Sequence, residues 1–76
     1  MRLQIFAAPD NWEIVGGVDI RTDRFARYYA NESRVAIARP LGRFTALICA
    51  DGTTYYVMSS DWSEVEHLAG QESGHS

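Results

Sequence analysis

Arginine and aromatic side chains alternate in RTDRFARYY, residues 21–29, the stretch of the chain best suited to binding chemistry. Arginine donates paired hydrogen bonds to carboxylates and phosphates, and aromatic rings stack on nucleobases or fill apolar interfaces. Residues 21–43 carry six arginines against two carboxylates, a net charge of +4. The other residues carry one arginine against eight carboxylates, a net of −7. The sequence therefore predicts two electrostatic poles. All seven basic residues are arginine, and a GC-rich genome is an alternative explanation for that choice of residue.

The remaining reactive side chains do not form a catalytic or metal-binding set. Cys49 is the only cysteine, and no histidine or cation stands beside it in the sequence, so we expect a buried structural thiol. Glu64 and His67 are three residues apart on a predicted helix, but two ligands leave a metal site incomplete. The pair Gly16-Gly17 lacks the spacing of a phosphate-binding loop and indicates a β-bulge or a close backbone contact. We predict no enzymatic activity, no cofactor and no bound metal.

Length and composition predict one small domain. A chain of 76 residues supports a single core, which we place at residues 1–70, and the polar segment at residues 71–76 is predicted to be a disordered tail. No apolar run approaches the roughly 18 residues that span a bilayer, and the N-terminal apolar stretch is too short for a signal peptide. We therefore expect a cytoplasmic protein.

The fold class predicted from residue patterns is α+β, a small antiparallel sheet of four to five strands with a C-terminal helix. β-Favouring runs predict strands at residues 2–8, 12–20 and 34–39, and a hairpin around Asp51-Gly52 within residues 43–60. Residues 59–70 show helical spacing of apolar residues. There, Asp61 and Glu64 are predicted to form a capping box, and Gly70 is predicted to end the helix.

The segment between the second and third strands has two interpretations. Phe25, Tyr28 and Tyr29 recur at the spacing of one helix face, with Thr22 as a possible cap, which favours one short helix over residues 22–30. The alternative is a strand that enters a hairpin through Asn31-Glu32, and the sequence leaves both open.

The predicted hairpin leads to an expectation about association. A two-residue type I′ turn at Asp51-Gly52 places Ile48 opposite Tyr55 and Leu47 beside Tyr56, so that both faces of the hairpin are apolar. The C-terminal helix covers one face. If the middle segment is a strand, the other face stays open, and open apolar faces are typical of interfaces. We therefore expect association with a second copy or with another protein.

These observations favour a non-enzymatic protein-binding module that inhibits or regulates a larger assembly, with a homodimer as one form. Its partner is expected to present an acidic patch. The predicted partner-binding residues are Arg21, Arg24, Arg27, Tyr28, Arg34, Leu47, Tyr56 and Met58.

In general character this small, acidic chain without catalytic motifs is similar to phage or mobile-element inhibitors such as anti-CRISPR proteins, although no motif carries that likeness. The alternative is a nucleic-acid-binding regulator that uses the arginine-rich segment 21–43, which the isoelectric point near 5.1 disfavours. A third class, a small-ligand or enzymatic domain, is disfavoured because so short a chain leaves little room for a pocket beside its core.

Overall fold

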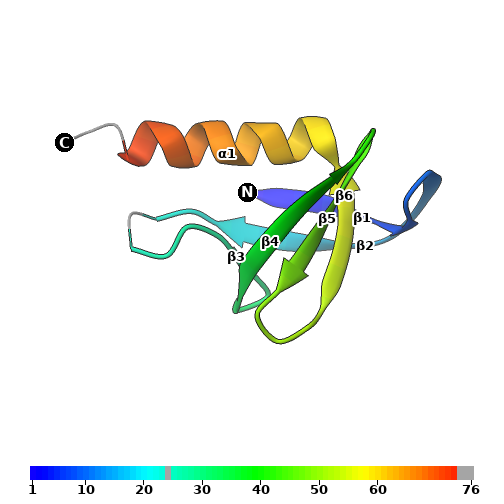
Figure 1. The fold of residues 1–76 in the computed structure, drawn as a ribbon, viewed down its shortest axis with the longest axis horizontal. Helices are drawn as coiled ribbons and strands as arrows, with labels where there is room; N and C mark the ends of the chain where they lie inside the picture. The colour runs from blue at the N-terminus through cyan, green and yellow to red at the C-terminus, as the bar shows by residue number, and fades with distance from the viewer. Residues whose placement is uncertain (24, 74–76) are drawn as a thin grey trace.

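The computed structural model describes residues 1–23 and 25–73, which form six β-strands followed by one α-helix (Figure 1). In chain order the elements are Arg2–Ala8 (β1), Asn11–Arg21 (β2), Tyr29–Ala30 (β3), Ser33–Leu41 (β4), Phe44–Cys49 (β5), Thr54–Met58 (β6) and Ser59–Ser73 (α1). The predicted antiparallel sheet with a C-terminal helix is confirmed. The number of strands is higher than the four to five predicted.

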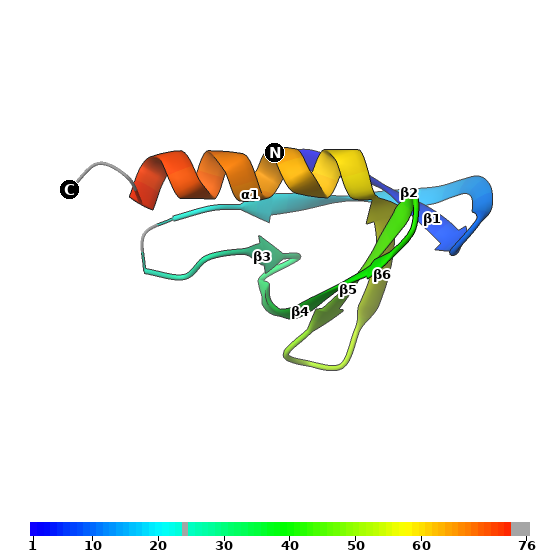
Figure 2. The ribbon, with the colours of Figure 1, turned by 45° about the horizontal axis from the view of Figure 1, so that its top comes forward.

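The sheet is closed into a barrel in which each strand pairs antiparallel with its neighbour in the chain. A single residue pair, Phe6 with Tyr56, joins β1 to β6 and completes the barrel. The helix α1 follows β6 directly and lies along one side of the barrel, roughly parallel to β2 (Figures 1 and 2). Closure explains one of the two apolar sides of the predicted hairpin, because that side becomes the interior of the barrel.

The predicted short helix between the second and third strands is wrong, and the strand alternative is right. Tyr29 pairs with Arg34 and Ala30 with Ser33. Asn31 and Glu32 between them have φ values of 48° and 68°, as a type I′ turn requires. Phe25 is 89% exposed, so the three aromatic residues do not form one buried helix face. The fully buried Ala30, which pairs with Ile20, anchors the strand instead.

The hairpin between β5 and β6 forms at the predicted place but with a different loop. Leu47 lies opposite Tyr55 and Ala46 opposite Tyr56, one residue away from the predicted register. The N–H of Gly52 donates to the carbonyl of Cys49 (2.9 Å), and only Gly52 of the two central residues has a positive φ, 92°. This is a three-residue loop with a glycine bulge, and the one-residue shift exchanges the faces of one strand relative to the other.

Replacing Gly52 by valine is expected to lower the free energy of unfolding by about 1 to 3 kcal/mol, because a β-branched residue is strained at positive φ. Gly16→Val is the matched control, since its side chain would also enter open space but without a positive φ. Urea unfolding followed by circular dichroism measures both. Equal effects of the two variants would contradict the proposed loop.

The interior of the barrel holds the main core. Its fully buried members come from five of the strands and from the helix; the largest include Leu3, Val18, Ile20, Leu47, Val57 and Val65. The helix contributes Trp62 and Val65, which confirms the first part of the apolar helix face predicted from residues 59–70. Leu68, which continues that spacing, is 40% exposed. The helix begins at Ser59, so Asp61 lies in its first turn and is not its cap. It also continues past Gly70, the predicted end. Of the predicted tail, residues 74–76 lie outside the described residues.

A β-bulge in β2 lies opposite two consecutive residues of β1, whose side chains are buried on opposite sides of the sheet. The register shifts between Ile5, opposite Gly16, and Phe6, opposite Ile14, which confirms the bulge predicted near the glycine pair. Ile5 points into the main core, whereas Phe6 packs outside it. There its ring lies 5.3 Å from that of Phe44 and 5.8 Å from that of Trp12. The barrel therefore has a second, smaller aromatic core on its outer surface.

Candidate functional site

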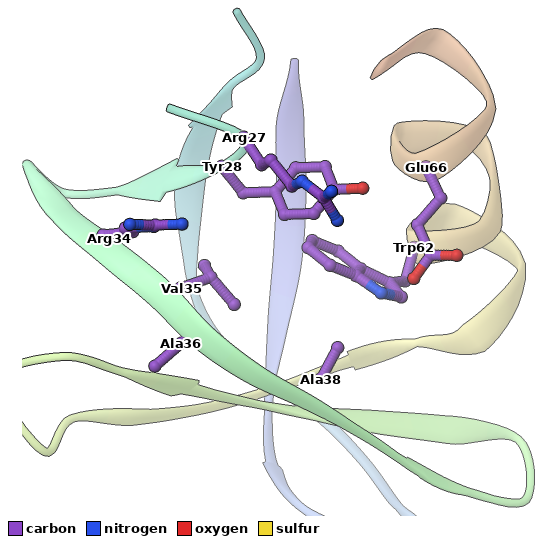
Figure 3. Close-up of a pocket in the computed structure, with 8 residues that line it drawn as sticks. All are labelled: Arg27, Tyr28, Arg34, Val35, Ala36, Ala38, Trp62 and Glu66. Atoms are coloured by element: carbon purple, nitrogen blue, oxygen red, sulfur yellow. The ribbon is translucent and has the colours of Figure 1, made fainter. Parts of the chain in front are cut away.

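A pocket of about 300 Å³ lies between β4, α1 and the chain just before β3 (Figure 3). We call it the arginine pocket. Its lining residues are Arg27, Tyr28, Arg34, Val35, Ala36, Ala38, Trp62 and Glu66. Polar groups surround an apolar floor, which is the composition of a site that holds a ligand group by its shape and by a few directed contacts.

Two aromatic rings form one wall of the arginine pocket. The rings of Tyr28 and Trp62 meet edge to face with centroids 4.7 Å apart. Trp62 is only 4% exposed, and within the described part of the chain its indole Nε1–H has no hydrogen-bond partner. The wall therefore joins the helix to the segment before β3 through ring packing.

Charged groups of both signs stand around these rings. Arg27 and Arg34 are exposed, and neither forms an ion pair with a carboxylate among the described residues. Burial raises the pKa of the Tyr28 hydroxyl, the negative charge of Glu66 raises it further, and Arg27 lowers it. The Tyr28 hydroxyl therefore lies within the influence of charges of both signs.

A local turn places Arg27 and Tyr28 at the pocket. The Oδ1 atom of Asp23 accepts hydrogen bonds from the backbone N–H groups of Phe25 (2.7 Å) and Ala26 (2.8 Å). These bonds, that of Ala26 first, hold the pKa of the Asp23 carboxyl below its ordinary value of 3.8. The turn is thus stabilised by the ionised carboxylate.

Acidification is expected to open this turn. Because the folded-state pKa of Asp23 is lowered, its stabilising effect is complete above pH 3.8 and is lost as the pH falls through the folded-state value. The amide signals of Phe25 and Ala26 in NMR spectra should therefore shift with a midpoint below pH 3.8. They should lose that titration in Asp23→Asn. A midpoint above pH 3.8 would contradict the assigned hydrogen bonds.

The structure brings three of the predicted partner-binding residues together, namely Arg27, Tyr28 and Arg34 in the arginine pocket. Arg21 is separate. Its guanidinium lies 5.4 Å from the centre of the Tyr29 ring, beside a second pocket of about 410 Å³ lined by Asp19, Arg21, Asn31 and Glu32.

The other predicted partner-binding residues lie elsewhere. Leu47 is completely buried in the main core, so in this structure it has no surface to offer a partner. The register shift in the β5–β6 hairpin turns it inward together with Tyr55. Tyr56 and Met58 are half-buried on the outer side of β6, opposite Ala46 and Phe44. Arg24 lies outside the described residues.

Sequence reasoning missed both residues that α1 contributes to the arginine pocket, Trp62 and Glu66. Their spacing of four residues on a helix is visible in the sequence, and it places both side chains on neighbouring turns of one face. Nothing in that spacing reveals that the helix packs against residues 27–28, because this depends on closure of the barrel. Sequence patterns therefore predicted the two arginines and Tyr28 but not the acidic and aromatic residues that α1 adds.

The structure also places the residues considered for other chemistry. Cys49 is buried, as predicted, and burial followed by the charge of Asp51 raises the pKa of its thiol. Within residues 1–23 and 25–73, no group of three or more histidine, cysteine, aspartate or glutamate side chains is arranged to hold a metal ion. No helix in the same part of the chain is long and apolar enough to cross a membrane.

Comparison with known proteins gave no match to a family model, to a curated protein or to a solved structure.

Proposed function

We propose that this chain is a non-enzymatic protein-binding module that inhibits or regulates a larger assembly by binding an acidic segment of a partner in the arginine pocket. The observation that carries the proposal is the convergence of Arg27 and Arg34, neither ion-paired within the described residues, on a pocket with an aromatic wall. Phage or mobile-element inhibitors of the anti-CRISPR kind are the general type.

The groups in the pocket suggest what it holds. Arginine forms paired hydrogen bonds with a carboxylate, so Arg27 and Arg34 suit an aspartate or glutamate side chain. Tyr28 and Trp62 offer ring edges and faces to an apolar neighbour of that carboxylate. A short acidic peptide with one aromatic or aliphatic residue satisfies both requirements.

Nearby carboxylates favour a protein over a nucleic acid. Glu66 shares the arginine pocket, and Asp19 and Glu32 share the second pocket with Arg21. A phosphate backbone carries a charge at every nucleotide and would be repelled by these groups, whereas a peptide with a single acidic side chain need not approach them. The chain also carries a net charge of −3.

The direct test uses the two tryptophans as separate reporters in NMR titrations. Trp62 lines the arginine pocket and Trp12 lies outside it, so only the indole N–H signal of Trp62 should move when an acidic peptide binds. The affinity of peptides that contain Glu-Phe-Glu is compared with that of analogues that contain Gln-Phe-Gln, whose side chains are uncharged amides, at about 150 mM salt. Arg34→Gln should weaken binding about tenfold, since charge-assisted hydrogen bonds are worth about 1.5 to 3 kcal/mol.

The matched control is Arg43→Gln, which removes an exposed arginine that does not line the pocket and should leave peptide affinity unchanged. Equal affinity for the acidic and amidated peptides would contradict the proposal. So would sub-micromolar binding of DNA or RNA at about 150 mM salt that is lost in Arg27→Glu/Arg34→Glu, because non-specific binding is typically weaker than that. The second result would favour the nucleic-acid-binding regulator.

A further inference from the structure

The outer side of the barrel carries an apolar surface that the arginine pocket does not include. We call it the aromatic face. Its exposed or half-buried residues surround the buried rings of Phe6 and Phe44 and are Trp12, Ile14, Leu41, Tyr56 and Met58. Directly paired residues share a face of a sheet, and the ladder pairs Phe6 with Ile14 and Tyr56, and Phe44 with Leu41 and Met58.

Three large side chains of the aromatic face are left open to solvent. Trp12 is 52% exposed, Ile14 is 53% exposed and Leu41 is 38% exposed. The Trp12 ring lies 4.9 Å from that of Phe44, so the β1–β2 turn brings these side chains close to β5. A contiguous apolar surface of this kind on a small domain is characteristic of an interface.

Opposite charges stand at the two sides of the aromatic face. Arg39 lies at the β4 edge of the aromatic face. It pairs with Ala46, and Ala46 pairs with Tyr56, so all three residues are on the same face of the sheet. Asp10 lies on the other side, in the β1–β2 turn two residues before Trp12. Both are exposed, and neither forms an ion pair with another described residue.

We propose that the aromatic face binds a second copy of this chain in a twofold-symmetric dimer. A twofold axis through the middle of the face exchanges its two sides, so Arg39 of one copy meets Asp10 of the other, and this contact occurs twice. The apolar centre is then covered and the charges form a complementary rim, which is the usual anatomy of an interface. This inference shares no residue with the arginine pocket and does not depend on the function proposed for it.

Self-association is measured by sedimentation equilibrium of the wild-type chain over a range of concentrations. Ile14→Lys should weaken the dimer at least about tenfold, because it places a charge in the apolar centre twice per dimer. Leu68→Lys is the control, since Leu68 is 40% exposed on α1 and belongs neither to the aromatic face nor to its charged sides. It should leave the dimer intact. Dimerisation that both variants weaken equally, or a wild-type chain that is monomeric at millimolar concentration, overturns the proposal.

The charge contact is tested by mixing. Arg39→Asp and Asp10→Lys should each weaken self-association several-fold, because each creates two like-charge contacts across the axis. An equimolar mixture of the two variants should recover wild-type association, since every contact in the mixed dimer again joins opposite charges. Circular dichroism verifies that each variant is folded, because Asp10 has a φ of 62° that lysine adopts less readily. Two folded variants that fail to associate on mixing would refute the Arg39–Asp10 contact and, with it, the twofold arrangement.

Discussion

Replacing Phe44 by alanine is expected to lower the free energy of unfolding by about 3 to 5 kcal/mol, which is the range for deleting a buried aromatic ring. Phe44 is completely buried and contacts both Phe6 and Trp12, so its removal leaves a cavity in the middle of the outer aromatic core. A domain of this size has a total stability of roughly 4 to 11 kcal/mol. The loss is therefore a large part of the whole.

Urea unfolding at low temperature measures this change, and Phe25→Ala is its control. Both variants delete a phenyl ring from a phenylalanine, but Phe25 is 89% exposed, so its replacement should change stability by no more than about 0.5 kcal/mol. Equal stability of the two variants would contradict a contribution of the aromatic core outside the barrel to the free energy of unfolding.

Replacing Trp62 by alanine is expected to destabilise the chain by a similar amount, about 3 to 5 kcal/mol. Trp62 belongs to the main core and packs against Tyr28, so its removal weakens the attachment of α1 to the barrel and to the segment before β3. The arginine pocket should lose one wall at the same time. Affinity for an acidic peptide is then expected to fall even under conditions in which the variant remains folded.

Trp62→Phe should cost much less, about 1 to 2 kcal/mol. It keeps a ring in the core, and it removes a buried N–H that has no partner within the described part of the chain. A buried unpaired donor costs about 1 to 3 kcal/mol, and relief of that cost offsets part of the lost packing. Thermal unfolding of the wild type and both variants gives the comparison. A larger loss for phenylalanine than for alanine would be incompatible with these contacts.

The strands and the C-terminal helix could be predicted because their patterns are local. Apolar alternation, the turn residues Asp51-Gly52 and the apolar spacing of Trp62 and Val65 each act over fewer than a dozen residues. The loop between β5 and β6 shows the limit of such reasoning. The same two turn residues fit a two-residue and a three-residue loop, and the choice depends on which residues the closed barrel can bury.

The arginine pocket was only half predictable for a related reason. Arg27, Tyr28 and Arg34 are close in the sequence, whereas Trp62 and Glu66 come from an element about thirty residues later. Helical spacing of Phe25, Tyr28 and Tyr29 suggested a helix, but Asp23 holds a local turn and Ala30 pairs in a strand. Tertiary packing outweighed local helix propensity there, as is common for short segments.

The closure of the barrel by one residue pair has a consequence for the order of folding. Every other strand pair joins neighbours along the chain, so each hairpin can form on its own at a low cost in chain entropy. The contact between Phe6 and Tyr56 instead closes a loop of fifty residues and gains one ladder pair. We expect the hairpins to form before this contact, and its formation to limit the rate. Truncating Phe6 would then slow folding, and so would truncating Ile20, because its pairing with β3 is already formed when the barrel closes.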